Sequence, residues 1–344
     1  MNHIEPIDFV VTWLDSNDPL WIEDYHKYKG SIKSGDHSDA RYRNWDDLFR
    51  FWFRAVENYA PWVNKVYLVT NGKFPDWINP DHPKIVLVKH SDFIPEKYLP
   101  TFNSITIELN LGRIEGLSEN FVYFNDDMYI NQPVEPTYYF RNGLPCDNTE
   151  ETFLMAAKYT PERSFDNYLH RICGIGLLNC QFNRREVVKK SFMKWINPRL
   201  SLAGILVSLF LTILKREKFE GFRGPHVEQP MIKSIFAEIW EKYEPMMNVS
   251  CSRFREDFSL NPYVIRYWQL AQNRFYPKRF KGKKINISLD NIDIIRKSLM
   301  SKNIKSICLN DDLSGLSDKD VLYLKETIVA FWQEKLPRKS KYEL

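Results

Sequence analysis

Two adjacent carboxylates follow a short apolar run in the first half of the chain. In the stretch FVYFNDDMYI, residues 121–130, four strand-forming residues are followed by Asn125, Asp126 and Asp127. Neighbouring carboxylates repel each other unless a cation or hydrogen-bond donors compensate, and their hard oxygen atoms suit Mg²⁺ or Mn²⁺, which in turn binds phosphate oxygens of nucleotides. The pair therefore predicts a divalent metal ion and a diphosphate. The same letters recur in CLNDDL, residues 308–313, so the tripeptide alone is not specific.

To bind a metal ion, these carboxylates must lie at the end of a strand that opens on a crevice. The first 130 residues alternate between apolar runs and amphipathic stretches, as is typical of α/β proteins. Ligands of open α/β sheets bind at the carboxyl ends of the strands, which is where Asp126 and Asp127 would lie. One helix is expected in NWDDLFRFWFRAVENYAPW, with Asn44 as its N-cap and Pro61 after its end. Strands are expected at residues 7–14, 66–70, 85–89 and 121–124.

The second half continues in the same style after a more helical region. We expect a helix starting at Met231, a second within PYVIRYWQLAQNRF, strands at 285–289 and 304–309, and a last helix capped by Ser317. The stretch TFNSITIELN, residues 101–110, fits two structures: its apolar alternation favours a strand, whereas Asn103 or Ser104 could cap a helix. The predicted division is an α/β part at 1–150, a mainly helical insertion at 151–280 and an α/β part at 281–344 that completes one catalytic unit.

Composition limits the class of protein and its surroundings. The 344 residues carry a net charge of +4, which is too small to predict nucleic acid as the main partner. Five cysteines form no CxxC pair, which suits a reducing compartment. The N-terminal MNHIEPIDFVVTW lacks the apolar core of a signal peptide, so we expect a cytoplasmic protein.

One apolar segment complicates that expectation. LSLAGILVSLFLTIL, residues 200–214, is shorter than the roughly 20 residues that a spanning helix needs. A buried core helix and a helix lying on a membrane surface both fit it. The flanks, which contain Trp195, Lys189, Lys190, Arg199, Lys215 and Arg216, favour attachment to anionic lipid at the inner face of the plasma membrane.

Four separated stretches resemble the Stealth family of capsular and exopolysaccharide phosphotransferases. IDFVVTWLDSNDPLW is similar to its first conserved region, and the second runs from RYRNWDDLFRFWF through YAPWVNKVYLVTNG to FVYFNDDMYI. GPHVEQPMIKSIFAEIWEKY through SRFREDF resembles the third region, and LPRKSKYE the fourth. The resemblance implies a Rossmann-like fold of the nucleotide-sugar transferase type, with a mixed or parallel sheet flanked by helices, and it favours the helix over the strand at 101–110.

The resemblance also implies a reaction. A UDP-sugar would give up its sugar-1-phosphate to a hydroxyl of a polysaccharide or lipid-linked oligosaccharide acceptor, leaving UMP. Carried over by position, the catalytic residues fall on Glu108, Asp127, His226 and Arg255, and a slip of two residues would substitute Arg253 for the last. Asp127 would hold the metal or receive the acceptor proton, His226 would act as base or proton donor, and Arg255 would contact the diphosphate.

Nucleotide contacts are expected at the ends of the first two strands. Trp13 and Asp15 could meet the uracil or ribose, as could Asn71 of the TNG turn, while Arg43 could contact phosphate. The chain departs from the family at Gly112, where histidine is common. Two alternatives stay open: a metal-dependent glycosyltransferase that forms a glycosidic bond and releases UDP, and a non-enzymatic scaffold on the membrane surface.

Overall fold

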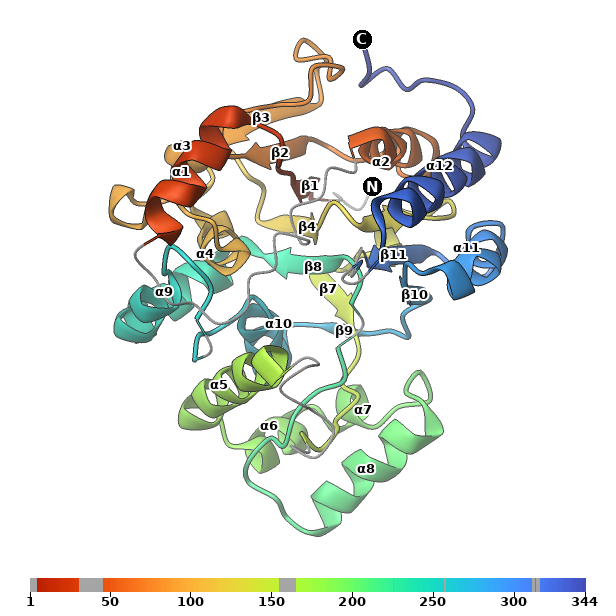
Figure 1. Ribbon diagram of the computed structural model, residues 1–344. Helices are drawn as coiled ribbons and strands as arrows, with labels where there is room; N and C mark the ends of the chain where they lie inside the picture. Colours follow the sequence, from red (N-terminus) through yellow and green to blue (C-terminus); the bar gives the residue numbers. More distant parts are fainter. Residues whose placement is uncertain are drawn as a thin grey trace.

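The computed structural model describes residues 5–30, 46–154, 165–224, 226–256, 258–310, 313 and 316–344. Its main sheet has five strands in the order β3-β2-β1-β4-β8, where the first four are parallel and β8 is antiparallel to β4. Their bounds are β1 Ile7–Thr12, β2 Val66–Thr70, β3 Ile85–Lys89, β4 Asn120–Phe124 and β8 Gln229–Ile232. An α/β fold with a mixed sheet flanked by helices is thereby confirmed (Figure 1).

Two smaller sheets complete the strands of the described ranges. One has the order β10-β11-β5, built from β10 Gly282–Asn286, β11 Ser306–Asn310 and β5 Met128–Ile130. The other joins β6 Phe140–Arg141, β7 Leu144–Asp147 and β9 Tyr276–Pro277. The expected strands at 285–289 and 304–309 are thus present as β10 and β11 with shifted bounds.

Helices cover both faces of the main sheet (Figure 1). Because side chains alternate along a strand, Phe9 and Val11 of β1 enter one core and Val10 enters the other. The first core contains Trp52 of α2 and Trp332 of α12. The helices are α1 Pro19–Lys29, α2 Asp46–Tyr59, α3 His90–Phe93, α4 Ser104–Asn110, α5 Phe165–Gln181, α6 Arg184–Lys190, α7 Phe192–Trp195, α8 Leu202–Ile213, α9 Lys233–Ser250, α10 Tyr263–Ala271, α11 Ile292–Leu299 and α12 Asp318–Lys335.

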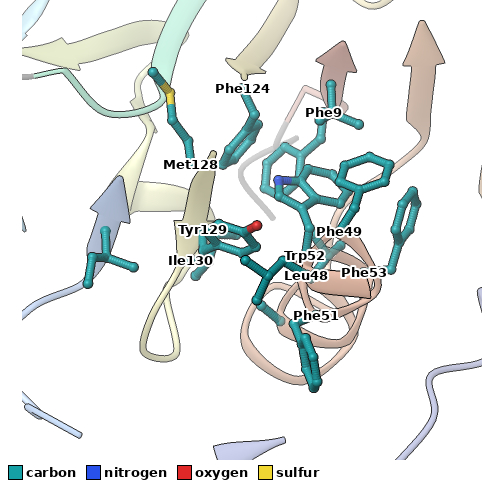
Figure 2. Close-up of a cluster of buried hydrophobic side chains, with 14 of the residues drawn as sticks. Phe9, Leu48, Phe49, Phe51, Trp52, Phe53, Phe124, Met128, Tyr129 and Ile130 are labelled. Atoms are coloured by element: carbon teal, nitrogen blue, oxygen red, sulfur yellow. The ribbon is translucent and has the colours of Figure 1, made fainter. Parts of the chain in front are cut away.

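Aromatic rings make the contact between α2 and the sheet. The Phe124 ring lies 5.0 Å from that of Phe9 and 5.4 Å from that of Trp52, measured between centroids (Figure 2). Phe124 is the last residue of β4, so this packing fixes the strand end that precedes the two aspartates.

Two sequence expectations about elements were wrong. Met231 does not start a helix, because Gln229–Ile232 forms the edge strand β8 and α9 begins only at Lys233. The first strand stops at Thr12 and does not reach residue 14.

The stretch 101–110, which fitted a strand or a helix, forms the helix α4. The side chain of its N-cap Asn103 accepts a hydrogen bond from the backbone N–H of Ile105.

The helix cap predicted at Ser317 is confirmed, with its hydroxyl 3.2 Å from the backbone nitrogen of Asp320. The N-cap predicted at Asn44 lies outside the described residues. In the part of the chain that the structure covers, no helix has both the length and the apolar composition needed to cross a membrane.

The C-terminal segment is held against α2 by a buried ion pair. The guanidinium of Arg54 donates to both carboxylate oxygens of Glu343, each at 2.9 Å. Both side chains are almost fully buried, so removal of one partner would leave the other charge uncompensated. The stretch LPRKSKYE therefore packs against α2 and closes this side of the fold, and the N–H of Leu344 next to it donates to the carbonyl of Trp77 at 2.8 Å.

Candidate active site

The candidate site lies where the strand order of the main sheet changes direction. From β1 the chain proceeds to β2 and β3 on one side, whereas β4 lies on the other side, so the carboxyl ends of β1 and β4 form a topological switch point. Val11 pairs with Phe124 at this end. Residues that follow Thr12 and Phe124 therefore emerge next to each other.

The turn after β4 is fixed at both ends. The N–H of Met128 donates to the carbonyl of Asn125 at 3.1 Å, and the N–H of Leu309 donates to the carbonyl of Asp127 at 2.9 Å. Asp127 thus lies between the main sheet and the small sheet that contains β11. Asp126 is exposed.

Asp127 is part of a group of three possible metal ligands. Ligand atoms of Asp127, His226 and Cys308 all lie within 4.8 Å of one another, and the Cys308 thiol is 3.1 Å from Oδ2 of Asp127. His226 reaches this point because β8 is antiparallel to β4, which places the start of β8 beside the end of β4. Sequence reasoning missed Cys308, and the predicted metal ligand Asp126 is not in the group.

The donor set allows a test of which cation would fit. A carboxylate suits Mg²⁺ or Mn²⁺, whereas an imidazole nitrogen and a thiol favour softer ions. The combination fits Mn²⁺ or Zn²⁺ better than Mg²⁺. Burial lowers the pKa of His226 to about 4, and the charge of Lys284 acts in the same direction, so the imidazole is neutral near pH 7 and its nitrogen is available as a ligand.

Glu108 lies on α4 with only 8% of its surface exposed. Burial raises the pKa of Glu108 to about 7, although the Arg255 guanidinium and hydrogen bonds with Tyr123 and Ser104 act in the opposite direction; the nearby Asp127 carboxylate raises it further. A carboxyl with this pKa can exchange a proton near neutral pH. Glu108 is thus electrostatically coupled to both Asp127 and Arg255.

The two candidate arginines have different environments. Arg255 donates to the Ser104 hydroxyl at 2.8 Å, at the start of the helix that carries Glu108. Arg253 donates to the carbonyls of Pro100 and Leu99 at 2.9 and 3.1 Å, and its guanidinium lies 4.1 Å from the ring centroid of Tyr28. Arg255 is therefore the arginine coupled to Glu108, and Arg253 holds the backbone of the preceding loop.

Tyr123 is a site residue that the sequence reasoning did not single out. It belongs to β4, and its hydroxyl lies 3.2 Å from Oγ1 of Thr12 and donates to Oδ1 of Asn125 at 2.6 Å. Burial raises its pKa well above the usual value, and the Glu108 charge adds to the effect. The sequence could have indicated Tyr123, because it lies two residues before the turn in FVYFNDD. A residue at that position has its side chain near the carboxyl end of the strand.

A cavity of about 340 Å³ opens beyond β1 and β2. It is lined by Trp13 and Asp15, as predicted for a nucleotide site, together with Arg50, Lys73, Phe74, Pro75, Asp76 and Trp77. Asn71 is adjacent to this group, where its side chain accepts from the backbone N–H of Lys73 at 3.4 Å. Arg43 lies outside the described residues. The cations Arg50 and Lys73 were not predicted, although Lys73 directly follows the TNG turn.

Gly112 is explained by close packing. A Cβ atom at this position would lie 2.7 Å from Cγ of Phe236 on α9. A larger side chain at this position therefore cannot fit unless α9 moves. The guanidinium of the neighbouring Arg113 lies 4.6 Å from the ring centroid of Trp240 and donates a hydrogen bond to Oδ1 of Asn110 at 2.9 Å.

Comparisons with known proteins identify relatives along the whole chain. The family model for Stealth protein CR2, conserved region 2, matches residues 41–147. The capsular polysaccharide phosphotransferase WcwK of Streptococcus pneumoniae is 36% identical over 349 residues, covering 100% of this chain and 99% of the relative. The exopolysaccharide phosphotransferase cps2G of Lactiplantibacillus plantarum is 35% identical, covering 98% and 96%. Among solved structures, the galactosyltransferase LgtC is 9% identical, covers 97% of this chain and 98% of its own, and has a TM-score of 0.37, which is too low to support an argument.

The full-length relatives confirm the resemblance drawn from the four conserved stretches. The 36% identity extends over 100% of this chain and 99% of the relative, so it does not come from one short motif. The matched range includes the stretches that carry Asp127, His226 and Arg255. The chain belongs to the Stealth family of capsular and exopolysaccharide phosphotransferases.

Proposed function

We propose that the protein transfers a hexose- or N-acetylhexosamine-1-phosphate from a UDP-sugar to a hydroxyl of a growing capsular or exopolysaccharide acceptor. The acceptor oxygen attacks the phosphorus that carries the sugar, the bond from that phosphorus to the bridging oxygen of the diphosphate breaks, and UMP leaves. The product is a phosphodiester. Since no bond at the anomeric carbon breaks, the anomeric configuration is retained.

One observation carries the proposal: Glu108, Asp127, His226 and Arg255 come from three distant stretches of chain and are coupled at one end of the main sheet. Phosphoryl transfer asks a protein mainly to position its reactants and to place positive charge around the phosphate, with a base for the incoming hydroxyl. The coupled group offers each of these parts. The relatives named as polysaccharide phosphotransferases support the same reaction class.

The environment of each residue suggests its role. Glu108, with its pKa of about 7, accepts the proton of the acceptor hydroxyl. Arg255 provides a guanidinium for the charge that develops on the transferred phosphate. Ser104 joins the two, since it accepts from Arg255 and hydrogen-bonds with Glu108.

A divalent cation, Mn²⁺ in preference to Mg²⁺, would be held by Asp127 and His226, and Cys308 would contribute to the choice of ion. Such an ion would neutralise the oxygens of the diphosphate. Asp126 stays a candidate for contact with the same ion from the exposed side of the turn.

The nucleotide is assigned to the cavity beyond β1 and β2. Trp13 offers a ring for the base, and Asp15 an acceptor for a ribose hydroxyl or a base N–H. Arg50 and Lys73 place positive charge on the wall of the same cavity, which suits a diphosphate. The β1 and β4 ends are neighbours, so a nucleotide there would direct its phosphates toward Asp127.

Product analysis tests the proposal. Purified protein is incubated with a panel of UDP-sugars, oligosaccharide acceptors and Mn²⁺ or Mg²⁺, and the products are identified by phosphorus NMR and mass spectrometry. UMP and a phosphodiester are expected. Release of UDP with a glycosidic product would refute the proposal in favour of a glycosyltransferase.

A pair of variants tests the assignment of the site. Asp127→Asn should abolish UMP release, whereas Asp290→Asn, which changes an exposed carboxylate outside the candidate site, should leave it unchanged. Unchanged turnover in Asp127→Asn would remove this carboxylate from the mechanism.

A further inference from the structure

Helix α8 presents an apolar face to the outside of the protein. Leu202 and Ile213 are 73% and 74% exposed, and Leu206 and Phe210 are 59% and 53% exposed. Their spacing of four, four and three residues places them on one side of a helix. The helix lies at the edge of the molecule farthest from the main sheet (Figure 1). The exposure excludes the buried core helix that the sequence had left open.

The side of α8 that faces the protein is small and polar. Ser208 is fully buried and donates to Oε2 of Glu151 at 2.9 Å, and Glu151 pairs with Arg184 at 2.6 Å. A Cβ atom on Gly204 would lie 3.1 Å from Cγ of Glu150, so the helix sits close to this loop. Surface helices normally turn their apolar stripe inward. Here the orientation is reversed, although Leu211 is buried.

Hydrogen bonds fix this reversed orientation. Arg184 donates to the carbonyl of Ser208 and to the hydroxyl of Thr212, both at 3.3 Å. Rotating α8 to bury its leucines would break these bonds and leave the buried pair of Arg184 and Glu151 without its polar neighbours, which costs free energy. The exposed face is therefore a stable feature of the fold. Phe192 and Met193 of α7 are exposed as well.

Positive charge surrounds the apolar face. Residues 185–218 contain eight basic and two acidic side chains, a net charge of +6, whereas the whole chain carries only +4. Lys189, Lys190, Arg199 and Lys215 are exposed next to α7 and α8. An anionic bilayer surface has acyl chains below phosphate headgroups. The apolar side chains suit the acyl layer, and the exposed cations beside them suit the phosphate layer.

We propose that α7 and α8 dock the protein on the surface of an anionic lipid bilayer. The occupant is a membrane and not a second copy of the chain, because face-to-face contact of two copies would bring two basic rims together. The side chains of Leu202, Leu206, Phe210 and Ile213 enter the acyl boundary, and the cations contact lipid phosphates. This inference deepens the proposed function, since it places the transfer reaction beside lipid-linked acceptors, but the docking itself does not depend on the chemistry.

Vesicle flotation tests the docking. The full chain should float with vesicles of phosphatidylcholine and phosphatidylglycerol and much less with phosphatidylcholine alone, and added salt should weaken binding. The double variant Leu206→Ser and Phe210→Ser should lose binding by roughly tenfold or more. The matched control is Leu322→Ser and Tyr323→Ser on α12, where the side chains are 55% and 53% exposed; it should bind like the wild type. Circular dichroism melting curves check that each variant is folded.

Two outcomes would overturn the proposal. One is a folded Leu206→Ser and Phe210→Ser variant that still floats with anionic vesicles. The other is a wild type that ignores vesicles but forms dimers in light scattering that this variant abolishes, which would make the face a contact between copies. UMP release with a water-soluble acceptor separates the docking proposal from the proposed function. The Leu206→Ser and Phe210→Ser variant should release UMP as the wild type does. If the wild type binds vesicles but releases no UMP, the proposed function alone is refuted.

Discussion

Substitution of Glu108 by glutamine should make the protein more stable at neutral pH while it removes activity. The carboxyl has a pKa raised from 4.5 to about 7 by burial. A shift of this size corresponds to about 3 kcal/mol of differential stability between its protonated and ionised forms. Glutamine has nearly the same shape and no charge to bury.

The sign of the pH dependence follows from proton binding. Well below pH 4.5 the carboxyl is protonated in both folded and unfolded protein. Between 4.5 and about 7 the folded protein keeps a proton that the unfolded chain has lost, so the free energy of unfolding of the wild type falls as the pH rises. Above about pH 7 both states are ionised, and the loss stays near its full value of about 3 kcal/mol. Glu108→Gln lacks this loss.

Urea unfolding of metal-free protein measures the effect. The stability of Glu108→Gln relative to wild type should increase by about 2.5 kcal/mol from about pH 5 to about pH 8. Glu115→Gln, at an exposed carboxyl close in sequence, is the control and should show no such trend. A constant difference between Glu108→Gln and wild type across this range would refute the raised pKa.

Kinetics measure the second half of this prediction. If Glu108 accepts the acceptor proton, kcat/KM of the wild type rises with pH through about 7, and Glu108→Gln loses on the order of 10²-fold to 10⁴-fold. A variant that is stabilised but still fully active would show that the buried carboxyl is not the base. These two readouts separate the electrostatic reasoning from the mechanistic one.

Four other substitutions test neighbouring features. Arg255→Lys should lower kcat/KM by roughly a hundredfold with little change in stability, since a point charge replaces a planar guanidinium. Arg253→Ala should instead lower the free energy of unfolding by about 1–3 kcal/mol, because it leaves two carbonyls without their donor. If kinetics and urea unfolding show the reverse pattern, the roles of the two arginines are exchanged. Gly112→Ala should destabilise the protein by about 1–3 kcal/mol in the same unfolding assay, because the new Cβ would lie 2.7 Å from a ring carbon of α9, and wild-type stability would contradict that packing. Cys308→Ser should weaken Zn²⁺ binding in calorimetry more than Mn²⁺ binding, with the exposed Cys180→Ser as control, and equal losses for both ions would argue against a thiol ligand.

The parallel strands could be predicted well because their burial leaves a simple signal. Val66–Thr70 and Ile85–Lys89 were predicted with the bounds the structure has, since strands covered on both faces read as continuous apolar runs. The edge strand β8 has no such run. It contains Pro230 and leads directly into α9, so its two apolar residues look like the first turn of the helix.

The helix that carries Glu108 shows a different limit. Ile105, Ile107 and Leu109 alternate like a strand, but only Ile105 and Leu109 are buried in the structure, four residues apart on one face of α4. Periodicity alone could not select between the two readings, and the Asn103 cap decides it. A short helix gives too few turns for the 3.6-residue period to exceed the two-residue one.

The site around Asp127 could be predicted only in part, because two sheets position it. The residue before its turn, Phe124, ends β4 in the main sheet, and Met128 after it begins β5 in the small sheet. β5 pairs with β11, and the register that sets Met128 opposite Cys308 brings the thiol to the carboxylate across 181 residues of sequence. No local pattern encodes that pairing. Residues 125–127 join two sheets that approach each other at this point, so the Asp127 carboxylate is held from both sides, and any change that shifts β11 should move Asp127 as surely as a change in β4.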